Sequence, residues 1–187
     1  IERAEVPPES IGFVEAHGTA TLIGDPIEVT ALTSAFAAAG SKERQYCALG
    51  SAKTNFGHLD RAAGVAGLMK TAMVVREGVI PPSLHYTTPN PKIDFESSPF
   101  FVNTALRLWE SGAAPRRALV CSLGVGGTNA HAVVEAPPER EPSGDSRAVK
   151  LLVLSARSGE ALSTATDQPI KHSNQHPDAN LADGAAT

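Results

Sequence analysis

Short apolar runs alternate with longer amphipathic stretches along the first 138 residues. The runs IGFVEA (residues 11–16) and YCALGSA (residues 46–52) predict two buried strands. An amphipathic pattern predicts a helix from about Pro26 to Ala39, and a more apolar pattern predicts a second helix from about Leu59 to Arg76. Because strands and helices alternate, the pattern indicates an α/β layered domain.

The two predicted helices carry different signals. In the stretch GDPIEV, we expect Asp25 to be the N-cap, Pro26 to take the first helical position and Glu28 to satisfy another free N–H group. The second helix is nearly free of charge between residues 62 and 69 and is apolar around its circumference. This pattern predicts a central helix that neighbouring elements cover on all sides.

The pattern changes twice in the second half of the chain. Residues 81–99 are rich in proline and polar side chains and predict an irregular segment. The run FFVNTAL (residues 100–106) is a strand candidate, and RALVCSL (residues 117–123) and NAHAVVEA (residues 129–136) bracket a glycine turn. This arrangement predicts a hairpin-like pair of strands.

After Ala136 the composition becomes that of a linker, PPEREPSGDSR. Beyond it, KLLVLSA (residues 150–156) is strand-like, and Ser158 is placed to cap a helix. Pro169 is expected to interrupt any longer helix there. We therefore predict two parts, a domain over residues 1–138 and a partial linker over residues 139–187.

Composition narrows the function classes. At 187 residues and 42% hydrophobic content, the chain can bury a core. Its net charge of −4 and its lack of a dense Lys/Arg block argue against nucleic acid or an anionic membrane as a partner. No apolar run is long enough to span a bilayer, and the N-terminus does not resemble a signal peptide, so we expect a cytoplasmic location. Cys47 and Cys121 lie in apolar runs, which favours buried, inert thiols over a disulfide.

Three histidines occupy positions that could carry chemistry. His17 follows a predicted strand, His58 lies at the start of the second helix, and His131 lies in the last strand. A single histidine is usually a hydrogen-bonded structural residue, but α/β folds collect reactive groups at the ends of their elements. Lys53, five residues before His58, is either a surface amine or a member of the same site.

A metal site is the rival explanation for these histidines. None of the three forms an HxxxH or HExxH spacing with another histidine. The acids Asp25 and Glu28 are already assigned as helix caps. We therefore expect no metal.

The glycine run SLGVGGTNAH (residues 122–131) is not a phosphate-binding loop. A GxGxxG pattern would need glycine where Asn129 stands, and the turn leads into a strand rather than a helix. No GxSxG surrounds a serine, which excludes the common serine-hydrolase signature. Two interpretations stay open: a tight turn between strands, or a turn that presents backbone N–H groups to a developing oxyanion.

Three long stretches carry a family resemblance. VEAHGTATLIGDPIEVTAL, GSAKTNFGHLDRAAGVAGLMK and SLGVGGTNAHAVVEAPP closely resemble, in order and spacing, the three C-terminal motifs of the β-ketoacyl synthase domain of modular, type I polyketide synthases. The resemblance covers roughly residues 1–138. Residues 139–187 resemble the start of the linker that joins such a synthase to an acyltransferase domain.

The resemblance implies a thiolase-like fold, of which this chain would be the C-terminal half, a layered α/β structure with a mixed sheet. It implies a decarboxylative Claisen condensation between a carrier-bound acyl chain and a malonyl-type extender. The implied partners are an acyl carrier protein with its phosphopantetheine arm, an N-terminal half that holds the nucleophilic cysteine, and a downstream acyltransferase domain. The complete domain would be a homodimer, no cofactor would be bound, and the isolated chain would be inactive.

The resemblance also assigns roles to individual residues. His17 and His58 match the two active-site histidines, and Lys53 matches the lysine that holds the second histidine in its electrostatic setting. The positions matching the substrate channel and the oxyanion turn, with Val125 at the gating position, are Thr19, Thr21, Gly124, Val125, Gly126 and Gly127.

The sequence departs from the family pattern at two positions. Ala20 replaces a glycine, which is tolerable if the backbone there is not at positive φ, and Leu123 stands where phenylalanine is common.

Two alternatives to a working synthase remain. One is an inactive or interaction-only ketosynthase fragment. The other is a Cys-His hydrolase that uses Cys121 and His17. The hydrolase is the weaker alternative because Cys121 has no basic neighbour in sequence to lower its pKa.

Overall fold

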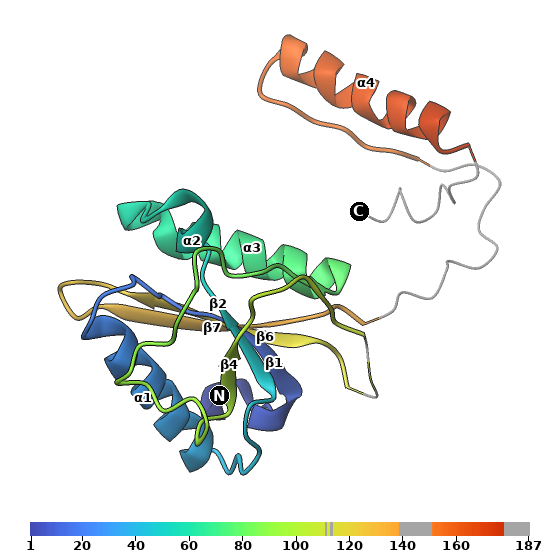
Figure 1. The fold of residues 1–187 in the computed structure, drawn as a ribbon. Helices are drawn as coiled ribbons and strands as arrows, with labels where there is room; N and C mark the ends of the chain where they lie inside the picture. Colours follow the sequence, from blue (N-terminus) through green and yellow to red (C-terminus); the bar gives the residue numbers. More distant parts are fainter. Residues whose placement is uncertain (111, 113, 139–150, 178–187) are drawn as a thin grey trace. The chain divides into compact units, whose positions relative to one another are not determined.

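The computed structural model describes residues 1–110, 112, 114–138 and 151–177 (Figure 1). The chain divides into two compact units, Ile1–Pro138 and Glu139–Thr187. The first unit contains the sheet and all the residues considered above as a site. Each unit is described by itself.

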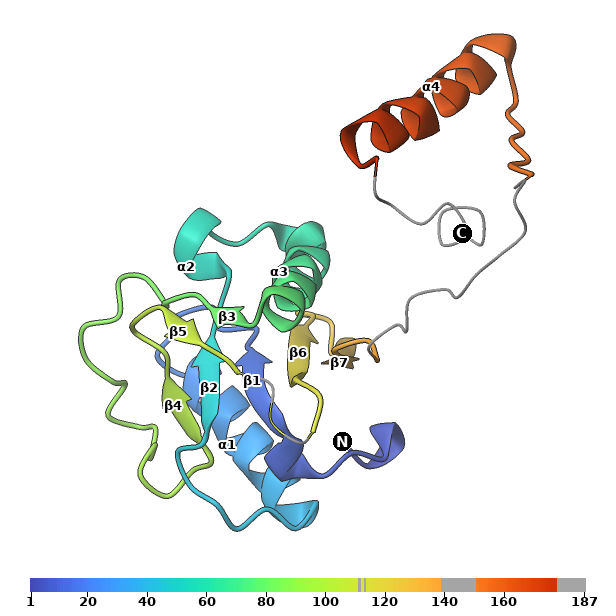
Figure 2. The ribbon, with the colours of Figure 1, turned by 90° about the vertical axis from the view of Figure 1, so that its right-hand side faces the viewer.

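A five-stranded mixed sheet with the order β4-β2-β1-β6-β7 forms the centre of the first unit (Figure 2). Strands β1 (Ile11–Glu15), β2 (Cys47–Gly50), β4 (Phe100–Val102) and β6 (Arg117–Leu123) run parallel, and β7 (Asn129–Glu135) pairs with β6 in the antiparallel direction. The predicted strands and the predicted hairpin are thus confirmed. Short, bounded apolar runs revealed β1, β2 and β6 because these strands are mostly buried at the centre of the sheet.

Two helices cover opposite faces of this sheet (Figure 1). Helix α1 (Gly24–Ala38) buries Val29, Leu32 and Phe36 in one core cluster. Helix α3 (Ala63–Glu77) contributes Val74 and Val75 to the cluster on the other face. The arrangement is an α/β layered domain, as the alternating pattern predicted.

The prediction that the second helix is covered on all sides is wrong for the described residues. The buried positions of α3 lie on one face, whereas Val65, Met69 and Met73 are 61%, 64% and 56% exposed. The sheet can cover only one face of a helix, and it contacts the small residues there. At Gly67 an added Cβ would lie 3.2 Å from Glu15 Cγ. The opposite, apolar face of α3 therefore has no cover within the described residues of the first unit.

Helix boundaries also differ from the expectation. Helix α1 begins at Gly24, and α3 begins at Ala63 after a 3₁₀ turn, Asp60–Ala62. The segment KTNFGH (residues 53–58), between β2 and α3, contains a short helix, α2 (Lys53–Phe56). The remaining short elements of the first unit are the 3₁₀ turns Glu2–Ala4 and Pro8–Ser10 and the two-stranded antiparallel sheet of β3 (Val79–Ile80) and β5 (Arg107–Leu108).

The described part of the second unit contains one helix, α4 (Gly159–Gln175). The predicted cap is confirmed, because the side chain of Ser158 accepts a hydrogen bond from Ala161 N–H at 3.2 Å. The expected interruption at Pro169 is wrong: α4 continues through this residue to Gln175.

The strand-like run at residues 151–156 forms no strand within the described residues, because no neighbouring strand of that unit is there to pair with it. Of the linker predicted over residues 139–187, residues 139–150 and 178–187 lie outside the described residues. Within the described ranges, no helix is both long enough and apolar enough to cross a membrane.

Candidate functional site

The parallel strands bring three loops to one edge of the sheet. Strands β1, β2 and β6 run in the same direction, so the segments that follow them emerge at the same edge. The loop after β1 carries His17, the segment after β2 carries Lys53 and His58, and β6 leads into the glycine turn at residues 124–127. This edge is where open α/β sheets place their ligands.

The two histidines converge although they are far apart in sequence. The ring centroids of His17 and His58 are 5.4 Å apart, and the ring planes make an angle of 81°. His58 Nδ1 accepts a hydrogen bond from Asp60 N–H at 3.0 Å, so a neutral His58 carries its proton on Nε2. His17 Nδ1 is buried and has no hydrogen-bond partner among the described residues. The pair therefore offers imidazole N–H groups at one place.

Lys53 supplies the positive charge beside this pair. The pKa of His17 is lowered below its usual value, chiefly by burial, then by the charge of Lys53 and by His58. Burial also lowers the pKa of Lys53, while Glu15 and Glu28 act in the opposite direction and favour its ammonium form. Lys53 thus acts on the first histidine as well as standing at the position that the resemblance pairs with the second.

A buried carboxylate holds the loop of His17. Glu28 on α1 accepts hydrogen bonds from the backbone N–H groups of His17 at 2.7 Å and Gly18 at 2.9 Å. Burial raises the pKa of Glu28, and these two hydrogen bonds oppose the rise. The prediction that Glu28 caps its own helix is therefore wrong. Its side chain turns toward the preceding loop and accepts from backbone N–H groups there.

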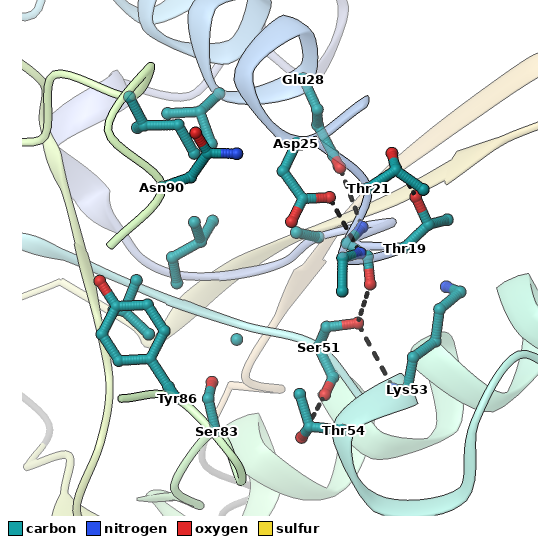
Figure 3. A pocket seen from close by; sticks show the side chains of 18 of the residues that line it. Thr19, Thr21, Asp25, Glu28, Ser51, Lys53, Thr54, Ser83, Tyr86 and Asn90 are labelled. Carbon is teal, nitrogen blue, oxygen red and sulfur yellow. Dashed lines mark hydrogen bonds between the residues drawn. The ribbon is translucent and has the colours of Figure 1, made fainter. Parts of the chain in front are cut away.

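Asp25 acts on the same loop and is not the helix N-cap. Its Oδ1 accepts from Ala20 N–H at 3.1 Å (Figure 3). The Gly24 N–H at the helix start is satisfied instead by Thr21 Oγ1 at 3.0 Å. Ala20 itself has a φ of +59°, in the left-handed region. The condition under which alanine would replace the family's glycine without strain is therefore not met.

Glu15, at the end of β1, is a residue that the sequence analysis missed. Its carboxylate is buried, accepts a hydrogen bond from Ala52 N–H at 2.5 Å and pairs with Lys70 Nζ on α3 at 2.6 Å. A sequence signal was present, because an acid inside an apolar strand requires a buried partner. The single lysine in the otherwise uncharged middle of α3 is that partner.

A cavity of about 660 Å³ opens beside this edge (Figure 3). Its wall includes Thr19 and Thr21, whose hydroxyls are 3.3 Å apart, together with Lys53 and His58. The irregular segment at residues 83–95 forms the facing wall. The structure thus places both predicted channel threonines in one cavity with the second histidine, while His17 lies between the lining residues Ala16 and Gly18.

The glycine turn lies at the same edge but is not bonded to the histidines. Gly124 N–H donates to Thr128 O and Gly127 N–H donates to Gly124 O, both at 2.9 Å. Gly127 has a φ of +88°, and Val125 is fully exposed at the tip. Among the described residues, no hydrogen bond joins the turn to either histidine. Gly126 N–H makes no backbone hydrogen bond there and stays available as a donor.

The remaining candidates from the sequence do not join the site. Cys47 and Cys121 are free and buried, and burial raises the pKa of both thiols, that of Cys121 to about 12. His131 lies opposite Cys121 in the β6–β7 register and is exposed. Thiols held in this state are poor nucleophiles, which argues against the Cys-His hydrolase. In the described ranges, His, Cys, Asp and Glu side chains form no group of three or more able to hold a metal ion.

Family models match the chain along nearly its whole length. Residues 1–87 match the model described as beta-ketoacyl synthase, C-terminal domain, and residues 89–187 match the ketoacyl-synthetase C-terminal extension. Among curated relatives, a phenolphthiocerol/phthiocerol polyketide synthase protein of Mycobacterium tuberculosis is 41% identical over 185 residues, which are 97% of this chain and 12% of that protein. Polyketide synthase PksL of Bacillus subtilis is 42% identical over 189 residues, which are 97% of this chain and 4% of that protein.

Solved structures of similar proteins agree. A ketosynthase from module 6 of the bacillaene synthase of Bacillus subtilis 168 aligns with a TM-score of 0.71 and 42% identity, over 98% of this chain and 33% of that chain. A ketosynthase from module 1 of the bacillaene synthase of Bacillus amyloliquefaciens aligns with a TM-score of 0.72 and 40% identity, over 100% and 31% of the two chains. The chain thus spans about a third of these ketosynthases and has their thiolase-like fold.

Proposed function

The chain belongs to the β-ketoacyl synthase family, as part of a polyketide synthase ketosynthase domain, and we propose that its site performs the decarboxylation step of a Claisen condensation. In that step the bond between the extender's methylene carbon and its carboxylate breaks and CO₂ leaves. The electron pair passes into an enolate of the carrier-bound thioester. The enolate carbon then attacks the acyl thioester on a cysteine, whose thiolate is the leaving group.

The convergence of His17 and His58 is the observation that carries this proposal. Two imidazole N–H groups at one place can donate hydrogen bonds to the thioester oxygen as negative charge builds on it. Each such donor contributes roughly 2.7 to 4 kcal/mol to stabilising an oxyanion in a site that excludes water. The hydrogen bond from Asp60 N–H to His58 Nδ1 leaves the Nε2 proton free for this task.

The charges around the pair support the neutral form that donation requires. Burial and the neighbouring Lys53 lower the pKa of His17, so its imidazole is uncharged near neutral pH. A neutral imidazole donates to an enolate without first delivering a full proton. Lys53 thereby acts through His17, and the acids Glu15 and Glu28 favour its charged form.

The cavity provides a path for the substrate. We assign Thr19 and Thr21 to binding of the phosphopantetheine arm of an acyl carrier protein, since their hydroxyls line the cavity that contains His58. The chain would bind no cofactor of its own. The turn of Gly124, Val125, Gly126 and Gly127 would supply a backbone donor to a second oxyanion, that of the acyl thioester under attack.

The condensation also needs groups that the described residues do not offer. The buried, high-pKa cysteines are unsuited to act as nucleophiles, so a second segment, the N-terminal half of the domain, would bring the reactive cysteine. The exposed apolar face of α3, formed by Val65, Met69 and Met73, is a surface that such a half could cover. A downstream acyltransferase domain, reached through residues 139–187, and homodimerisation of the complete domain complete the proposed assembly.

The roles can be tested in a complete domain, formed by joining this chain to a ketosynthase N-terminal half that carries the cysteine. With His17→Ala or His58→Ala, decarboxylation of a malonyl extender should fall about 100-fold or more, while acyl transfer to the cysteine largely survives. Glu77→Ala, on the exposed end of α3, serves as the control and should change neither rate. Persistence of decarboxylation in both histidine variants, with loss of acyl transfer, would assign the histidines to nucleophile activation instead.

The chain alone should form no acyl-enzyme. Covalent catalysis needs an activated thiol or hydroxyl beside a base, and both thiols here are buried. Incubation with an acyl thioester followed by intact-mass analysis should show the unmodified mass. A stable acyl adduct on Cys47 or Cys121 would overturn this part of the proposal.

A further inference from the structure

The buried carboxylate of Glu15 connects the two segments that carry the site. Glu15 is the last residue of β1, and only Ala16 separates it from His17. Its side chain crosses to the neighbouring segment, where Oε1 accepts the hydrogen bond from Ala52 N–H. Ala52 is the N-cap of α2, and the next residue is Lys53. One residue is therefore bonded to both loops.

Lys70 fixes the direction of that carboxylate. Its Nζ lies 2.6 Å from Glu15 Oε2, and the side chains of Glu15 and Lys70 are 3% and 18% exposed. The ammonium also lies 5.4 Å from the centre of the Phe13 ring. A buried pair of this kind is retained only when its geometry satisfies both charges, and Oε1 is left free for Ala52.

The packing of α3 against the strand leaves little freedom at this point. An added Cβ at Gly67 would lie 3.2 Å from Glu15 Cγ, and one at Gly50 would lie 3.5 Å from Lys70 Nζ. The carboxylate is thus confined between α3 and the ends of β1 and β2. Because the side chain of Glu15 is held in one place, its hydrogen bond with Ala52 N–H can fix the position of the N-terminus of α2.

We propose that Glu15 is a positioning residue that sets the place of Lys53 and His58 relative to His17, an inference that rests on the function proposed above. Short helices such as α2 have little stability of their own, so their orientation depends on outside contacts. The bond from Ala52 N–H to Glu15 is such a contact at the first turn. Glu15 does not touch the substrate in this role; it acts through the residues that do.

Nuclear magnetic resonance on the chain itself tests the geometry. In the unaltered chain we expect a nuclear Overhauser contact between the His17 and His58 rings and slow hydrogen exchange at Ala52 N–H. Glu15→Ala should remove the ring contact and speed that exchange about tenfold or more, because the N–H loses its acceptor. The double variant Glu15→Gln with Lys70→Met keeps a neutral acceptor without an unpaired ammonium and should restore both signals.

Glu135→Ala is the matched control. This variant also removes the carboxylate of an ion pair, that with Arg117. The pair lies at the end of the β6–β7 hairpin away from the glycine turn. Glu135→Ala should lower the thermal midpoint without altering the ring contact or the exchange of Ala52. If Glu15→Ala lowers only the global stability, hydrogen exchange should become faster throughout the first unit while the contact between the two histidine rings remains. That result would overturn the proposal. An unchanged Ala52 exchange rate would overturn it as well.

Kinetics in the complete domain separate this inference from the proposed function. Glu15→Ala should lower kcat for extender decarboxylation with little change in KM, and the double variant should recover most of the loss. If the ring contact is lost and kcat stays unchanged, Glu15 has no positioning role in the reaction. If His17→Ala and His58→Ala also leave decarboxylation unchanged, the proposed function fails, whatever the result for Glu15.

Discussion

The imidazole rings of His17 and His58 meet edge to face, 5.4 Å apart between centroids, although each lies in a loop rather than in a strand or long helix. The loop of His17 is held by Glu28, and the segment before His58 is held by Glu15. Both acids are buried, and both accept hydrogen bonds from backbone N–H groups. The geometry of the site therefore depends on carboxylates that lie behind the histidines.

The first prediction concerns the proton on His17. Because burial, Lys53 and His58 all lower its pKa, Lys53→Met should raise it toward the ordinary value of 6.5. A titration of the histidine ring resonances measures this directly. The control is Lys42→Met, which removes a charge from the loop after the C-terminal end of α1. The N-terminal end of that helix is the one near His17, so this variant should leave the pKa of His17 unchanged. A His17 pKa that does not respond to Lys53→Met would remove Lys53 from this role.

The same shift fixes the sign of a pH effect on stability. A histidine whose pKa is lower in the folded state binds fewer protons there than in the unfolded state. The contribution of His17 to stability is therefore complete above pH 6.5 and is lost as the pH falls through the folded-state pKa. The loss should be smaller in Lys53→Met. Urea unfolding at a series of pH values measures it, with His17→Gln as the variant in which this contribution is absent.

The second prediction concerns Ala20. Ala20 has a φ of +59°, and a residue with a Cβ in this conformation is strained by roughly 1 to 2 kcal/mol. Replacement by glycine removes the strain, but glycine also increases the entropy of the unfolded chain, which offsets part of the gain in stability. We expect Ala20→Gly to raise the free energy of unfolding by about 0.5 to 1 kcal/mol in urea. Ala35→Gly, at an exposed position inside α1, should lower it by a similar amount. Equal effects of the two substitutions would contradict the strain at Ala20.

The sequence predicted those parts of the fold that depend on local pattern. Strands β1 and β2 and the β6–β7 hairpin follow from bounded apolar runs, and Ser158 follows from its capping position. Strands of two residues, such as β3 and β5, are too short to produce a pattern. The apolar circumference of α3 could not reveal which face the sheet would cover, because periodicity vanishes when all sides are apolar.

The site was predictable only in part. The positions of His17 and His58 at the ends of elements, and the family motifs, pointed to both residues. Glu28 was noticed but assigned to the wrong N–H groups, because a capping signature does not distinguish a helix's own donors from those of a neighbouring loop. Glu15 was missed because its partners, Ala52 and Lys70, are distant in sequence and meet it only in the folded chain.

The third prediction concerns Glu28. Glu28→Ala leaves the part-buried N–H groups of His17 and Gly18 without an acceptor, and an unsatisfied donor that is shielded from water costs about 1 to 3 kcal/mol. We expect a loss of about 2 to 4 kcal/mol in the free energy of unfolding and faster hydrogen exchange at both amides. Glu28→Gln keeps one acceptor oxygen and should lose less. Glu77→Ala, an exposed partner of Arg76, should change stability by less than about 1 kcal/mol, and a comparable loss there would deny Glu28 a special role.

The last prediction separates the proposed function from the Cys-His hydrolase. Cys47 and Cys121 are buried, and burial raises both pKa values, that of Cys121 to about 12. A thiol reagent at about pH 8 reacts with thiolate, so labelling must await local opening of the strand and should be about 100-fold slower or more in the native chain than in urea. Ser34→Cys, on the exposed side of α1, provides a labelled control whose native and unfolded rates should be similar. Rapid native labelling of Cys121, slowed by His17→Ala, would show a thiolate activated by that histidine, and the histidine pair would then belong to a nucleophile instead of an enolate.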